Sequence, residues 1–307
     1  MSVDQTEAAE HLERCIHAAC ALEVRARKPG NVHPDAAFID LTADDLERAG
    51  EAVAPVIARA GRRGTGATGT GEIGIGATIL QAVQATQRVS QGNPNLGIIL
   101  LLTPLAAVPL QQSLAEGIGA VLDRLTVSDA ELTYEAIRIA KPGGMGKVAA
   151  ADLAEPPRLT LREAMALAAE RDLIAAQYGN QFELILQTAL PWLQTTDWQT
   201  GAWERAIQQL QLRLLSEFPD SLIQRKCGRD IAEEASLRAK RILDAGWPDG
   251  EQSNRLWQEY DQWLRADGHR RNPGTTADLI AATLFAGFRE RLLPLPEFVR
   301  TGVRPLH

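Results

Sequence analysis

The chain has 307 residues, of which 45% are hydrophobic and 23% charged, and its net charge of −7 gives a pI of about 5.4. This composition is typical of a globular protein, and the acidic balance excludes a general affinity for nucleic acid or anionic membranes. The opening MSVDQTEAAEHLER is too polar for a signal peptide, and the most apolar run, LGIILLLTPLAAVPL, is too short to span a bilayer. We therefore expect a cytoplasmic protein with reduced cysteines at Cys15, Cys20 and Cys227.

The first half of the chain has the periodicity of helices. A first helix is expected to end at Pro29 and Gly30, and one of its faces carries Leu12, Ile16, Ala19, Glu23 and Ala26. Further helices are expected over about 44–60, 75–89 and 111–124, and the apolar run at 97–108 is expected to be a buried helix. Ser128 or Asp129 would begin the next helix.

The second half begins with the longest expected loop, KPGGMGKVAAADLAEPPR, because glycine and proline are frequent there. Thr160 and Glu163 have the spacing of a capping box, which predicts a long helix from TLREAMALAAERDLIAAQY. Later helices are expected over about 202–217, 230–245, 253–266 and 276–291. The sequence thus predicts an all-α protein with one large multi-helix domain over residues 1–307, which leaves room for a smaller helical lobe.

The stretch GTGEIG at 69–74 fits the glycine pattern of a dinucleotide-binding loop. That loop needs a buried strand before it and an acidic residue about 20 residues later. The preceding VIARAGRRGTGAT is basic and broken by glycine, and no Asp or Glu occurs between Glu72 and Glu116. We therefore reject a Rossmann enzyme, and the glycines need another explanation.

Four short clusters place Arg or Lys next to glycine: RARKPG, GRRG, RKCGR and HRRNPG. Glycine lets backbone N–H groups approach a ligand, and basic side chains neutralise phosphate, so convergence of the clusters would form a polyphosphate site. The alternative for each cluster is the end of a helix, with a basic last turn and a glycine stop.

Several acidic residues stand at unusual positions. Glu23 lies on the apolar face of its helix, where a buried carboxylate needs a cation, a donor or a proton. Asp278 fits a helix cap together with Thr275, and Asp220 fits a turn. The pair Arg171–Asp172 fits a solvated ion pair within a helix. Each acidic residue, taken alone, is compatible with a purely structural role.

Four segments in order, LEVRARKPGNVHP, GEIGIGATILQAVQAT…NPNLG, PDSLIQRKCG and NPGTTADLIAATLF, resemble the triphosphoribosyl-dephospho-coenzyme A synthase family. The resemblance extends from about residue 12 to 290, with a variable stretch near 150–215. It implies an enzyme in which the 2′-hydroxyl of dephospho-coenzyme A attacks C1′ of the ATP ribose and adenine leaves. Such chemistry needs a carboxylate to accept the hydroxyl proton and cations to bind the triphosphate. The expected cofactor is Mg²⁺, the usual partner of a triphosphate.

The resemblance assigns roles to individual residues. Candidates for the general base are Glu23, Glu72, Asp220 and Asp278, and the last three are also candidate metal ligands. Candidates for binding substrate or phosphate are Lys28, Gly30, Asn31, His33, Asn93, Arg225, Lys226, Asn272 and Gly274. In this interpretation the glycines before Glu72 let a helix start approach the nucleotide.

The chain also departs from the family pattern. Asn95 and Leu96 replace a His–Lys pair, and KPGGMGKVAAADL replaces an Arg-Gly-Glu element. These differences indicate a divergent branch. They leave open a pterin-type acceptor in one-carbon cofactor synthesis, and also a protein that binds nucleotides without turnover. The expected partners are small molecules, ATP and a coenzyme precursor, with neither nucleic acid nor membrane; the sequence does not determine the oligomeric state.

Overall fold

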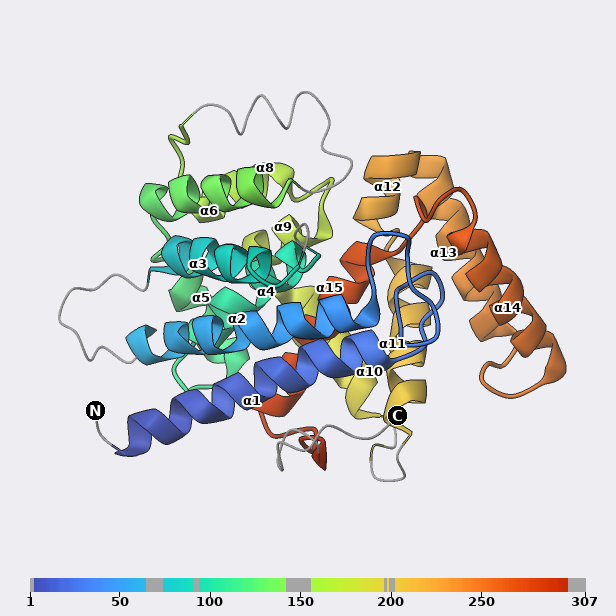
Figure 1. Ribbon diagram of the computed structural model, residues 1–307, viewed down its shortest axis with the longest axis horizontal. Coiled ribbons are helices and arrows are strands. Elements are labelled where there is room, and N and C mark those ends of the chain that lie inside the picture. Colours follow the sequence, from blue (N-terminus) through green and yellow to red (C-terminus); the bar gives the residue numbers. More distant parts are fainter. Residues whose placement is uncertain are drawn as a thin grey trace.

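The computed structural model describes residues 3–64, 74–90, 94–141, 156–195, 198 and 202–297, with the side chains of 3–6 and 61–64 left out. Regular structure in these ranges is helical, as predicted, and one isolated bridge joins His33 and Ala36. The elements (Figure 1) are α1 (Val3–Arg25), α2 (Ala43–Gly64), α3 (Ile75–Gln87), α4 (Leu96–Ala107), α5 (Leu114–Leu122), α6 (Val127–Ala140), α8 (Leu161–Ala168), α9 (Leu173–Gly179), the π-helical turn η1 (Leu184–Ala189), α10 (Leu190–Gln194), α11 (Trp203–Glu217), α12 (Ser221–Cys227), α13 (Arg229–Asp244), α14 (Glu251–Arg265) and α15 (Gly274–Arg289).

Capping residues explain where several of these helices begin. Thr160 and Glu163 form the predicted capping box at the start of α8. The single long helix expected after it is wrong, because α8 ends at Ala168 and a new helix, α9, begins after Asp172. The carboxylate of Asp172 accepts hydrogen bonds from the backbone N–H groups of Ile174 and Ala175. An N-cap with this strength competes with continuation of the helix.

The larger hydrophobic core lies among α1, α2, α3, α4 and α15. Every residue of α4 from Gly97 to Ala107 is buried, as predicted for the apolar run. The predicted apolar face of α1 is also buried, from Leu12 to Ala26. These helices bury apolar faces against one another, which is the main source of stability in an all-α fold.

A second, smaller core is formed by α12, α13, α14 and the end of α11. Leu215, Ile223, Tyr260 and Leu264 are buried in it. In Figure 1, α12, α13 and α14 lie together at one side of the molecule, away from α6 and α8. This group corresponds to the smaller helical lobe for which the sequence left room.

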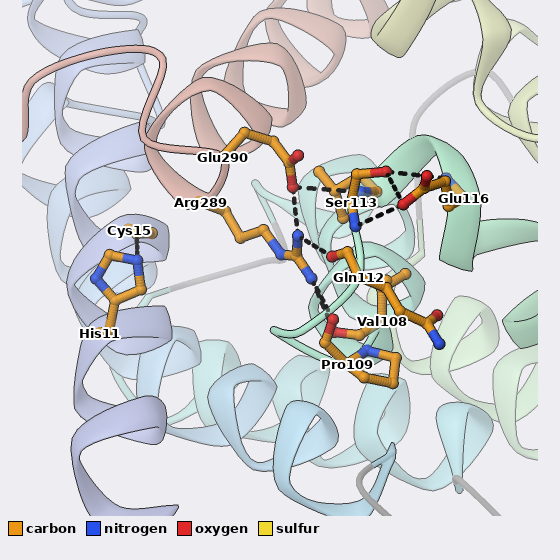
Figure 2. A network of polar contacts seen from close by, with 10 residues as sticks. His11, Cys15, Val108, Pro109, Gln112, Ser113, Glu116, Arg289 and Glu290 are labelled. Carbon is orange, nitrogen blue, oxygen red and sulfur yellow. Dashed lines mark hydrogen bonds and ion pairs between the residues drawn. The ribbon is translucent and has the colours of Figure 1, made fainter. Parts of the chain in front are cut away.

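Helix α15 runs through the larger core and is buried along most of its length. At its C-terminal end the buried Arg289 donates hydrogen bonds to the carbonyl oxygens of Val108, Pro109 and Gln112. Figure 2 shows this contact with the connection between α4 and α5, together with the neighbouring Glu290. The clamp fixes one end of α15, and the opposite end reaches the cavity described next.

No helix in the described part of the chain is both long and apolar enough to cross a membrane.

Candidate active site

A cavity of about 1590 Å³ opens where the two cores meet. Its walls come from the end of α1, the loop 31–41, the N-terminal ends of α4, α9 and α15, and parts of α6, α8 and α12. Ligand sites for drug-sized molecules usually occupy about 300–1,000 Å³. The cavity is therefore large enough for more than one such ligand.

The structure brings many of the sequence-predicted residues to this cavity. Those that line it are Glu23, Asn31, Arg225, Lys226, Asn272, Gly274 and Asp278. Four others do not line it: Lys28, Gly30, His33 and Asp220. Glu72 and Asn93 lie outside the described residues. Glu23 and Asp278, separated by 255 positions in the chain, thus share one cavity because helix packing places α1, α12 and α15 together.

Asp278 is a half-buried carboxylate on the cavity wall, in the second turn of α15. It does not cap α15, which begins at Gly274, so the alternative of a cap pair with Thr275 is wrong. Instead its carboxylate accepts a hydrogen bond from the backbone N–H of Ile98, in the first turn of α4. The positive end of the α4 dipole therefore faces this carboxylate.

The pKa of Asp278 is raised well above its ordinary value. Burial is the largest cause, followed by repulsion from the carboxylates of Glu23, Asp220 and Asp172, and the N–H of Ile98 opposes the rise. A carboxyl group with a raised pKa accepts a proton more readily than an ordinary one. This is the property expected of a general base on a cavity wall.

Gly97 explains how the carboxylate comes so close to α4. A Cβ atom at this position would collide with the carboxylate of Asp278 and with the side chain of Ile174. The preceding Asn95 is buried and its Oδ1 accepts a hydrogen bond of 3.0 Å from Thr86, whereas Leu96 lines the cavity. The two residues that replace the family's His–Lys pair therefore contribute one structural contact and one apolar wall residue.

Glu23 and Lys28 form a buried ion pair beside the cavity. Lys28 Nζ lies 3.0 Å from Glu23 Oε1, also contacts the carbonyl oxygen of Glu23, and is 3.4 Å from that of Ala26. The side chain of Lys28 has no exposed surface. The phosphate contact predicted for Lys28 would require its ammonium group to leave these oxygens. As the structure stands, Lys28 balances the charge of Glu23, which does line the cavity.

Asp220 is fully buried and fastens two helices together. One of its oxygens accepts hydrogen bonds from the N–H groups of Leu222 and Ile223 at 2.9 and 3.0 Å, and the other accepts two from the N–H and hydroxyl of Thr276, both at 2.8 Å. Burial raises the pKa of Asp220, and these four donors oppose the rise. The catalytic and metal roles assigned from the resemblance stay predictions, and the contacts observed join the starts of α12 and α15.

Asp172 is a site residue that sequence reasoning missed. Besides capping α9, it lines the cavity and its Oδ2 lies 3.2 Å from a guanidinium nitrogen of Arg225. The solvated pair expected between Arg171 and Asp172 is wrong, because Asp172 pairs with Arg225 across the cavity. The helix break that aims Asp172 at α12 could have been found from the Asp, a strong N-cap residue, ahead of a second apolar run.

Lys226 is a cation of the cavity wall that makes few contacts with the protein. Its Nζ lies 3.4 Å from Oδ1 of Asn272, and within the described residues it forms no ion pair. Partial burial and the neighbouring Arg225 lower its pKa. Close by, the rings of Phe38 and His269 stack with centroids 4.1 Å apart, and both line the cavity. An anionic ligand at this end would compensate the charge of Lys226.

The predicted loop residues after α1 make contacts that support the cavity wall. Gly30 has a φ of 73° and donates its N–H to Asp261, while Asn31 accepts a hydrogen bond from Gln211 at 2.8 Å. His33 is half-buried, accepts the N–H of Asp35, and has a pKa lowered by burial. Of these three predicted residues, Asn31 alone also lines the cavity.

The carboxylates of the cavity determine where a metal ion could bind. Within the described residues no group of three or more His, Cys, Asp or Glu side chains is arranged to hold a metal ion. Mg²⁺ often binds through one or two carboxylates together with substrate phosphates. Glu23 and Asp278, on the same wall, fit this second arrangement.

Comparisons with known proteins agree on one group of relatives. The family model described as CitG, ATP:dephospho-CoA triphosphoribosyl transferase, matches residues 9–296. A crystal structure named as a candidate triphosphoribosyl-dephospho-coA synthase from Archaeoglobus fulgidus is 26% identical, has a TM-score of 0.60, and is matched over 79% of this chain and 97% of that chain. No curated protein matches the chain. The family match includes every described cavity residue from Glu23 to Asp278.

Proposed function

The chain belongs to the family of ATP:dephospho-CoA triphosphoribosyl transferases, and from this premise we propose that the cavity binds both substrates, with Asp278 as the general base. The enzyme transfers the triphosphoribosyl group of ATP to dephospho-CoA. The bond formed joins the acceptor hydroxyl oxygen to C1′ of the ATP ribose, and the bond broken joins C1′ to adenine.

The placement of Asp278 carries the assignment of the base. The acceptor hydroxyl loses a proton as it attacks C1′, so a proton acceptor must lie at the reacting end of the cavity. Asp278 is a half-buried carboxylate there, and its pKa is raised by burial and by neighbouring carboxylates. Asp220 is fully buried and Glu23 is paired with Lys28, so neither is as available to a substrate hydroxyl.

The carboxylates have a second role in this proposal. Positive charge develops at C1′ in an oxocarbenium-like transition state, and nearby negative charge stabilises it. Glu23 and Asp172 both line the cavity and interact electrostatically with Asp278. This cluster would stabilise the sugar cation as adenine leaves.

The cations of α12 provide the other half of the site. Arg225 and Lys226 line the cavity together with Asn272, and we assign them to the triphosphate of ATP. Mg²⁺ bound to the triphosphate would neutralise phosphate charge, and Glu23, a carboxylate of the cavity wall, would help to hold it while Asp278 acts as the base.

The test is release of free adenine. The purified protein is incubated with Mg-ATP and dephospho-CoA, and adenine and the enlarged nucleotide are measured by chromatography with mass detection. We expect both products in equal amounts, and neither when either substrate is omitted. Adenine release only with a pterin-type acceptor would assign the protein to one-carbon cofactor synthesis. ATP binding without adenine release for any acceptor would leave a nucleotide-binding protein without turnover.

A further inference from the structure

The two ends of the cavity differ in chemistry. One end is formed by α12 and the segment before α15, with Arg225, Lys226 and Asn272. The other end is formed by α6 and α8, whose lining side chains in the described chain are apolar or aromatic: Tyr134, Ile137, Ile139, Ala140, Leu161, Ala164, Met165, Leu167 and Ala168. Gln87, Lys141 and Arg171 are the polar residues beside this lining. In Figure 1, α6 and α8 lie on the opposite side of the molecule from α12.

Two residues of this cavity are unusually exposed for their type. Among the large hydrophobic side chains described as exposed, Ile39 at 100% and Leu167 at 72% have the highest values, and both line the cavity. Folding gains nothing from such residues, because their surface remains in water. Apolar side chains exposed beside a concave site are typical of ligand contact.

Nucleotide phosphates explain the charged end of the cavity, but they do not explain its apolar end. ATP is polar at its triphosphate and ribose and has no aliphatic part. Dephospho-CoA combines an adenosine diphosphate with a long uncharged arm, pantetheine, which has methyl and methylene groups along its length. A pterin ring, by contrast, presents a flat face edged with hydrogen-bonding groups. The aliphatic lining of α6 and α8 matches the arm of dephospho-CoA and does not match the edge of a pterin.

We propose that the apolar end of the cavity is the binding site for the pantetheine arm of the acceptor, with Leu167 of α8 as a contact that selects an acceptor with this arm. This inference rests on the proposed function for the identity of the acceptor. The acceptor adenosine would then lie between this end and Asp278, with its reacting hydroxyl toward the charged end. Removal of the arm would expose the apolar lining to water again and weaken acceptor binding.

The experiment compares two ligands that differ only in the arm. Dephospho-CoA and the methyl ester of ADP share adenosine, diphosphate and net charge, and their Kd values are measured by titration calorimetry. We expect wild-type protein to bind dephospho-CoA at least tenfold more tightly. The variant Leu167→Ser should lose much of this difference through weaker dephospho-CoA binding, with the Kd of the methyl ester unchanged.

The control is Leu237→Ser, at an exposed leucine on α13 that does not line the cavity. Because both leucine side chains are exposed, the substitutions should leave folding intact, which is checked by thermal unfolding. Equal Kd values for the two ligands in the wild type, or an unchanged preference in Leu167→Ser, would overturn the inference and leave the transferase function standing. Arm-dependent binding without adenine release would support the inference and overturn the proposed function.

Discussion

At the scale of single residues, the carboxylates of the site differ in the groups that stabilise them. Glu23 forms an ion pair with Lys28, and Asp172 forms one with Arg225. Asp220 accepts hydrogen bonds from four donors. Asp278 has one N–H donor and three carboxylates acting on it. It is therefore the carboxylate of this group for which ionisation is most costly, and a proton from a substrate would relieve that cost.

Asp278→Asn tests this role. Adenine release should fall by about 10²–10⁴-fold, the usual contribution of a general base. A helix cap would instead lose about 1 kcal/mol of stability on substitution and spare the rate. Because the folded-state pKa of Asp278 is raised, the folded state binds more protons and ionisation lowers stability as pH rises, so the Asn variant should be equally or more stable at neutral pH.

The pH profile of the wild type gives an independent check on the same residue. The rate should rise with pH through the raised pKa of Asp278, above the ordinary carboxyl range, because the base acts in its ionised form. Asp244→Asn, at an exposed carboxylate of α13 paired with Lys240, serves as the control and should change neither rate nor profile. A normal profile with full activity in Asp278→Asn would assign the base to another residue.

At the scale of elements, the N-terminal end of α4 is the most specific part of the site. It presents the Ile98 N–H to Asp278, and Gly97 provides the space for the carboxylate. This gives the NPNLG segment a physical meaning: its glycine permits close packing of α15 on α4. The N-terminal ends of α9 and α15 lie at the same cavity, so three helix dipoles direct partial positive charge toward it.

Gly97→Ala should therefore damage the site more than the fold. Alanine favours helices by about 1 kcal/mol over glycine, but its Cβ would displace the carboxylate of Asp278 from the Ile98 N–H. We expect kcat to fall at least tenfold and the pH profile to move, because the hydrogen bond that opposes the raised pKa is lost. Gly179→Ala is the matched control, since a Cβ there meets no atom within 4 Å. Equal kinetics for both variants would argue against the role of Gly97.

The sequence predicted elements better than it predicted contacts. The apolar spacing in α1 and the apolar run of α4 were sufficient to predict buried helices, because periodicity reports directly on burial. The break at Asp172 was missed because an N-cap and a solvated helix residue have the same local pattern. The motifs around Lys28 and Asp278 indicated a shared site, but they did not reveal that Lys28 turns inward to Glu23. Side-chain direction depends on tertiary packing, which local spacing does not encode.

At the scale of the whole molecule, the cavity connects two hydrophobic cores. The larger core carries Glu23 and Asp278, and the smaller one carries the helix with Arg225 and Lys226. The Asp172–Arg225 ion pair and the Asp220–Thr276 hydrogen bonds join the two sides. A triphosphate bound between them would add contacts to both cores, so ATP should increase the stability of the molecule as a whole.

Lys226→Met tests this coupling through the free energy of unfolding, measured with denaturant with and without Mg-ATP. At 100 times its Kd, ATP should stabilise the wild type by about 2.7 kcal/mol. Loss of one charge-assisted phosphate contact weakens binding by about tenfold or more, which lowers the increment at the same concentration to about 1.4 kcal/mol or less. Without ATP the variant should not be destabilised, because burial already lowers the pKa of Lys226 and it forms no ion pair in the described residues.

The control is Lys240→Met, at an exposed lysine of α13, which should keep the full stabilisation by ATP. If Lys226→Met also kept the full stabilisation by ATP, the triphosphate would bind away from α12.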